Sequence, residues 1–121
     1  MPPRITDGYQ VVLNGATGAE LRVEFARERR EIVDYSVVLV VEHDGEGQVV
    51  RVYDGAHGVN ELHRYTVRRG KQAGEVFHAG TLGDGMRDAI VQIRTSYEAM
   101  IVHGSETERP GCEIARRSRL R

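Results

Sequence analysis

The sequence predicts an α+β domain, in which an antiparallel sheet of about five to six strands is followed by one long C-terminal helix packed on one face. Short apolar runs separated by glycine-containing turns predict the strands, and an apolar stripe between Met86 and Met100 predicts the helix. A chain of 121 residues has room for one core. We therefore expect a single domain over residues 1–104 and a basic, disordered tail over residues 105–121.

The first two strands are predicted on either side of Asn14-Gly15, a dipeptide typical of hairpin turns. Residues 1–8 contain two prolines and a glycine, so we expect a loose segment before a short strand at Tyr9–Leu13. Apolar and charged residues alternate over Leu21–Phe25, which is typical of a half-buried strand. Residues 26–31 are charged and carry no apolar stripe, and we expect a solvated strand end or turn there.

The clearest strand is Tyr35–His43, because Val37–Val41 is β-branched and apolar on both faces. Such a strand needs cover on both sides, from the helix on one and from something else, such as a partner, on the other. The next strands, separated by polar turns, are predicted at Gln48–Asp54, Leu62–Arg68 and Glu75–Ala79.

The helix has a recognisable start and end. Thr81 stands three residues before Asp84, as in a capping box. We expect the helix to continue to about Val102 and to close at Gly104. The predicted buried face consists of Met86, Ile90, Ile93, Tyr97 and Met100.

Composition excludes several classes of protein. The formal net charge of −1 gives no overall attraction to nucleic acid or anionic membranes. No apolar run approaches the roughly 20 residues that cross a bilayer. Cys112 is the single cysteine, so no internal disulfide can form, and we expect a cytoplasmic protein. The arginine-rich tail has a second interpretation, an arm that contacts nucleic acid or an acidic partner.

Reactive side chains concentrate between Arg51 and Tyr65, across a strand end, a loop and the next strand. Alternation places His63 and Tyr65 on one face of their strand, and Leu62 and Arg64 on the other. If the two strands pair, Arg51 or Tyr53 can lie opposite His63 or Tyr65.

This set of residues suits RNA cleavage without a metal or other cofactor. Histidine can take and return protons near neutral pH, and arginine binds phosphate oxygens. The predicted catalytic residues are His57 and His63, as acid and base, and Asp54, which orients His57. The predicted phosphate-binding residues are Arg51 and Arg64. The predicted auxiliary residues are Tyr65 and His78.

Other interpretations of these motifs stay open or fail. Asp-Gly, His-Gly and Asn are also ordinary loop formers. Asp54, His57 and His63, with His78 in reserve, could form a metal site, but their spacing matches no strong motif and we expect no metal. Gly80–Gly85 is glycine-rich but lacks the lysine of a phosphate-binding loop, so it is interpreted as a strand-to-helix turn.

The segment from Tyr35 to Ile90 resembles the TumE family of toxin components of toxin–antitoxin pairs. The resemblance consists of a long apolar strand, an Asp-Gly turn, a return strand ending in Arg51-Val52-Tyr53-Asp54, the histidines His57 and His63, and a closing helix. It departs from that family where Val52 separates Arg51 from Tyr53 and where Gly58, not a second histidine, follows His57. The resemblance implies a toxin with a cognate antitoxin and an RNA-linked target.

Two functions are therefore carried forward. The first is a toxin-like domain that acts on RNA, with RNA and an antitoxin protein as partners. The alternative is a non-enzymatic protein-interaction or dimerisation module, with a homodimer as the expected assembly.

Overall fold

The computed structural model describes residues 4–43 and 45–106, which form seven strands and one helix. The predicted α+β class is confirmed. The elements are β1 (Arg4–Asn14), β2 (Ala19–Glu28), β3 (Glu31–His43), β4 (Glu46–Asp54), β5 (Asn60–Thr66), β6 (Gly70–Lys71), β7 (Glu75–His78) and α1 (Leu82–Glu106). The predicted tail lies outside the described residues from residue 107 onward.

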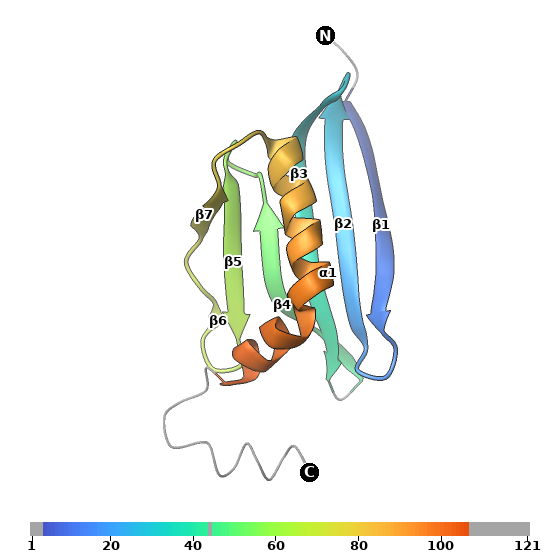
Figure 1. Ribbon diagram of the computed structural model, residues 1–121, viewed down its shortest axis with the longest axis vertical. Helices are drawn as coiled ribbons and strands as arrows, with labels where there is room; N and C mark the ends of the chain where they lie inside the picture. Colours follow the sequence, from blue (N-terminus) through green and yellow to red (C-terminus); the bar gives the residue numbers. More distant parts are fainter. Residues whose placement is uncertain (1–3, 44, 107–121) are drawn as a thin grey trace.

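The sheet is an antiparallel meander in which β1 to β5 pair in chain order, and both β6 and β7 pair with β5. Helix α1 lies across one face of this sheet, as Figure 1 shows. The opposite face, here called the open face, has no helix over it among the described residues.

The core lies between α1 and the sheet. Val37 pairs with Val23 on one side and with Tyr53 on the other, so one row of side chains continues across three strands. All three are at most 1% exposed, and Ile93 of α1 is fully buried as well. Burying an aliphatic side chain of this size contributes about 2 kcal/mol.

The helix begins as its sequence predicts. The Thr81 hydroxyl accepts a hydrogen bond from the Asp84 amide at 3.1 Å, and the Asp84 carboxylate accepts one from the Arg87 guanidinium at 2.6 Å. Arg87, and then Thr81, lower the pKa of Asp84 from its ordinary value of 3.8. The ionised carboxylate therefore stabilises the first turn of α1.

We expect Asp84→Asn to change how stability depends on acid. A group whose pKa is lowered by folding stabilises the protein above its unfolded pKa, and the stabilisation is lost as pH falls through the folded pKa. The free energy of unfolding should therefore differ between wild type and variant at about pH 6, and the difference should shrink towards about pH 2. Urea unfolding across this range measures it, and a difference that does not depend on pH would contradict the assignment.

Several predicted boundaries are wrong: β3 begins at Glu31 and not Tyr35, and β5 spans Asn60–Thr66 and not Leu62–Arg68. Two further errors have a clear physical reason. Residues 4–8 are part of β1, paired with β2 from Arg4–Glu28 onward, and not a loose segment. Their side chains are exposed on both faces, so backbone pairing holds the strand and no burial pattern marks it. Gly104 does not close the helix. It lies buried within α1, where a Cβ atom would approach the Tyr65 carbonyl oxygen to 3.3 Å.

Helix α1 covers one face of β3, as expected. Val37 and Leu39 face the helix and are fully buried. Val38 and Val40 face the open side, where Val38 pairs with Val52 of β4 and is partly exposed, whereas Val40 is only 5% exposed. No helix in the described part of the chain combines the length and apolarity needed to cross a membrane.

Candidate functional site

A cluster of ionisable side chains lies on the open face where β4 ends and β5 begins. Asp54 pairs with Glu61, and Val52 pairs with His63, in the β4–β5 register. Because paired residues of antiparallel strands share a face, Asp54, Glu61 and His63 all face away from α1. One ligand-type atom from each of these three side chains lies within 4.8 Å of the others. We call them, with His57, the histidine–carboxylate cluster.

His57 lies at the outer rim of this cluster. Its side chain is 79% exposed, and its Nδ1 atom lies 2.8 Å from Oε1 of Glu61. The hydrogen bond to Glu61 raises the pKa of His57 from 6.5, and the same bond lowers the pKa of Glu61 from 4.5. The pair therefore favours a protonated imidazole beside an ionised carboxylate.

His63 lies deeper, with a side chain only 14% exposed. Its Nδ1 atom lies 3.4 Å from the Gln72 carbonyl oxygen, which can only accept, so Nδ1 carries the proton. The other ring nitrogen, Nε2, lies 3.7 Å from Oδ2 of Asp54, beyond hydrogen-bond length. In the neutral ring the unprotonated Nε2 atom thus faces the Asp54 carboxylate.

Gly74 covers this part of the cluster. A Cβ atom at Gly74 would lie 2.6 Å from Cε1 of His63 and 3.2 Å from Oε2 of Glu61. The segment between β6 and β7 can pass this close to the two side chains only because residue 74 has no side chain.

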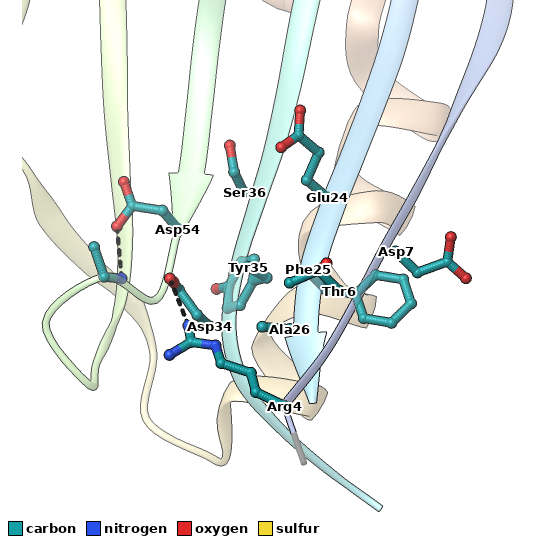
Figure 2. Close-up of a pocket in the computed structure, with 11 residues that line it drawn as sticks. Arg4, Thr6, Asp7, Glu24, Phe25, Ala26, Asp34, Tyr35, Ser36 and Asp54 are labelled. Carbon is teal, nitrogen blue, oxygen red and sulfur yellow. Dashed lines mark hydrogen bonds and ion pairs between the residues drawn. The ribbon is translucent and has the colours of Figure 1, made fainter. Parts of the chain in front are cut away.

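Asp54 also borders a hollow of about 400 Å³ at the end of the sheet. Figure 2 shows this hollow from the side away from α1. The Asp54 carboxylate accepts a hydrogen bond from the Ala56 amide at 3.2 Å. Among the described residues of its wall, the only cation is Arg4, which pairs with Asp34 at 3.5 Å. The carboxylates on the wall are Asp7, Glu24, Asp34 and Asp54, so the hollow itself is acidic.

The predicted phosphate-binding arginines do not join the histidines. Arg51 pairs with Arg64, and this row faces the helix side of the sheet, opposite to His63. Arg64 is bound there to Glu75 at 2.5 Å. The expectation that Arg51 or Tyr53 lies opposite His63 is therefore wrong, because the register is shifted by one residue from the one it required.

The remaining predicted residues separate into two groups. Tyr65 shares the open face with His63 and pairs with Lys71 of β6. His78 lies elsewhere, where its Nδ1 atom accepts a hydrogen bond from the Gly80 amide at 2.9 Å just before α1. Asp54 was expected to orient His57, but the partner of His57 is Glu61.

Glu61 and Lys71 were not singled out as functional residues by sequence reasoning. A signal for Glu61 exists, since it stands two residues before His63 on a strand and therefore shares its face. Lys71 lies near enough for its charge to lower the pKa of both His57 and Glu61. It places a cation on the open face where the two arginines were expected.

Comparison with known proteins gives one positive result. Neither the curated proteins nor the solved structures contain a significant match to this chain. A family model described as a domain of unknown function, DUF7718, matches residues 6–103, which include every residue of the cluster. The chain therefore belongs to the DUF7718 family.

Proposed function

We propose that this domain cleaves RNA by acid–base catalysis, with His57 and His63 as the proton-transfer groups. The observation that carries the proposal is that the two imidazoles lie on one face of the sheet and each is next to a carboxylate. Two histidines in different environments are what a two-proton reaction requires, since one must start protonated and the other neutral.

The two environments support different roles. In its neutral form, with the proton on Nδ1, His63 has a free lone pair on Nε2, and in this proposal it is the base that takes the proton from a ribose 2′-hydroxyl. The 2′-oxygen then attacks phosphorus and the bond from phosphorus to the 5′-oxygen breaks. His57, held towards its protonated form by Glu61, gives its proton to the leaving 5′-oxygen. The products are a 2′,3′-cyclic phosphate and a free 5′-hydroxyl.

The charge distribution favours one direction of approach. The acidic hollow beside Asp54 would repel a phosphate chain. The β5–β6 side carries Lys71 on the open face next to Tyr65, and Arg68 and Arg69 in the exposed turn. A single strand can bind there through its phosphates and stack a base on Tyr65.

The toxin assignment rests on the resemblance of residues 35–90 to the TumE family, since the matching family model is described without a function. Under this proposal an antitoxin would bind over the open face and cover the cluster together with the partly exposed valines Val38 and Val52. That same uncovered surface favours the second candidate function, a non-enzymatic interaction module or homodimer.

The expected result is RNA cleavage by purified protein in the presence of EDTA. His57→Ala and His63→Ala should each lower the rate at least about 100-fold, since general acid–base groups contribute about that much or more. His103→Ala is the matched control, because this histidine is exposed on α1 outside the cluster, and its rate should equal that of wild type. A substrate with 2′-deoxyribose should not be cleaved.

Two outcomes would remove the catalytic proposal. One is full activity in the His57→Ala/His63→Ala double variant, which would assign the activity to other groups or to a contaminant. The other is a wild-type protein that is folded by circular dichroism and does not cleave RNA. If light scattering then shows a stable dimer, the interaction module becomes the supported function.

A further inference from the structure

We infer that Asp54, Glu61 and His63 form a binding site for a divalent transition-metal ion of the Zn²⁺ class. This inference does not rest on RNA cleavage, because it concerns what the cluster binds. It replaces the sequence-based expectation of no metal, which considered His57 and His78 as ligands and did not include Glu61.

The first observation that supports a metal site is the orientation of the His63 ring. Metal-binding histidines commonly donate one ring N–H to a backbone carbonyl, which fixes the ring and turns the other nitrogen towards the metal. His63 has this arrangement, with Nδ1 bonded to the Gln72 carbonyl oxygen at 3.4 Å. Its Nε2 atom then faces a carboxylate oxygen, an arrangement that a proton on Nε2 or a metal ion between the two atoms stabilises.

The second observation is the distance between the donor atoms, which is close to that in a zinc site. Zinc binds imidazole nitrogen and carboxylate oxygen at about 2.0–2.2 Å, so tetrahedral donors lie about 3.3–3.6 Å apart. Nε2 of His63 and Oδ2 of Asp54 are 3.7 Å apart, so this pair needs a movement of a few tenths of an ångström. All three donor atoms lie within 4.8 Å of one another, so small side-chain rotations bring Glu61 into the same site. All three side chains are partly buried, at 14%, 18% and 21% exposure for His63, Asp54 and Glu61, which limits how far they can separate.

The donor set decides the class of metal. One imidazole nitrogen with two carboxylate oxygens suits Zn²⁺, Co²⁺ or Mn²⁺, whereas Mg²⁺ and Ca²⁺ prefer oxygen ligands alone. Three protein ligands leave at least one coordination position for water or a small ligand. His57, bonded to Glu61 from the solvent side, can supply a fourth donor or stay as a partner that orients Glu61.

Metal binding and the proposed acid–base role exclude each other, because a metal on Nε2 of His63 removes the lone pair that would accept a proton. Zn²⁺ should therefore inhibit RNA cleavage, and EDTA should restore it. The two proposals fail separately. Metal binding without cleavage leaves this inference standing, and cleavage without metal binding leaves the proposed function standing.

The test is isothermal titration of EDTA-treated, dialysed protein with Zn²⁺, and titration with Co²⁺ followed by its visible absorption. We expect one ion per chain and a Co²⁺ spectrum of low coordination number. Asp54→Asn, Glu61→Gln and His63→Ala should each weaken binding at least about tenfold. The first two substitutions keep the side-chain shape, so they should fold even if His63→Ala does not.

Matched controls separate this site from ordinary surface binding. Glu24→Gln removes a carboxylate from the neighbouring acidic hollow, and His103→Ala removes an exposed histidine, so both should bind Zn²⁺ as wild type does. The inference is overturned if no binding is detected at micromolar Zn²⁺. It is equally overturned if Asp54→Asn and Glu61→Gln bind as tightly as wild type, or if the controls lose as much affinity as the cluster variants.

Discussion

Replacing Asn60 by alanine is expected to lower the free energy of unfolding by about 3 kcal/mol. Asn60 is 1% exposed, and its side-chain oxygen accepts a hydrogen bond from the Tyr35 hydroxyl at 2.7 Å. Its nitrogen donates to the carbonyl oxygens of His78, Gly80 and Thr81 at 3.3, 3.0 and 3.1 Å. One amide thus joins β3 and β5 to the segment that leads into α1, and its loss leaves these buried groups without their partner.

The reason for the large effect is burial, and Asn14→Ala tests this reason. Asn14 also accepts hydrogen bonds through its side chain, from the amides of Ala16 and Thr17, but in an exposed hairpin. Water can replace those bonds, so Asn14→Ala should cost about 1 kcal/mol or less. Urea unfolding of both variants gives the comparison, and equal losses would show that burial of Asn60 is not what makes it important.

Burial also keeps the Tyr35 hydroxyl, the hydrogen-bond donor to Asn60, in its protonated form. Desolvation raises the pKa of Tyr35 well above its ordinary value, so the phenol keeps its proton and remains a donor at neutral and moderately alkaline pH. Tyr35→Phe removes this donor alone, and we expect it to cost clearly less than Asn60→Ala because the three carbonyl bonds persist.

Much of the fold follows from local patterns in the sequence. Alternation around Val23, the apolar run Val37–Val41 and the helical stripe around Ile93 each specify an element and its buried face. The first half of β1 follows from no such pattern, since an edge strand exposed on both faces is held by backbone hydrogen bonds that any residue type can make. The predicted helix end at Gly104 is wrong for a related reason. A glycine that permits close packing cannot be distinguished by sequence from one that ends a helix.

The histidine–carboxylate cluster could be predicted only in part. Sequence alternation correctly separates His63 from Arg64 within β5, because side-chain direction along one strand is fixed. It cannot say which residue of β4 lies opposite, and a shift of one residue moves a side chain to the other face of the sheet. In the structure that shift puts Arg51 on the helix side and Asp54 beside His63. The register therefore changes the chemistry of the site from cationic to anionic.

The second large effect is expected at Gly85. A Cβ atom there would lie 1.9 Å from Oδ1 of Asn60, which is impossible without movement. Asn60 cannot turn away without breaking its buried hydrogen bonds, so Gly85→Ala should lower the free energy of unfolding by about 3 kcal/mol, as overpacked core sites commonly do. This is opposite in sign to the usual effect of alanine in a helix, which is about 1 kcal/mol more favourable than glycine.

Gly83 supplies the matched control, since it lies in the same first turn of α1. A Cβ atom at Gly83 meets its nearest neighbour, Cγ1 of Ile32, at 3.6 Å, an ordinary contact. Gly83→Ala should therefore leave the free energy of unfolding unchanged or raise it by up to about 1 kcal/mol. Thermal and urea unfolding of the two alanine variants should move in opposite directions, and a shared loss would point to the glycine backbone rather than to Asn60.

A double-mutant cycle identifies the clash directly. In the Asn60→Ala background the atoms that Gly85→Ala would strike are absent, so the second substitution should cost little and the double variant should be about as stable as Asn60→Ala alone. The coupling between the two sites should then be about 3 kcal/mol, at the upper end for residues in contact. Additive losses would mean that α1 shifts away from the sheet to make room, and Asn60 would not fix the start of the helix against β5. With strong coupling, the buried amide sets the position of β5, and β5 carries Glu61 and His63 on its other face.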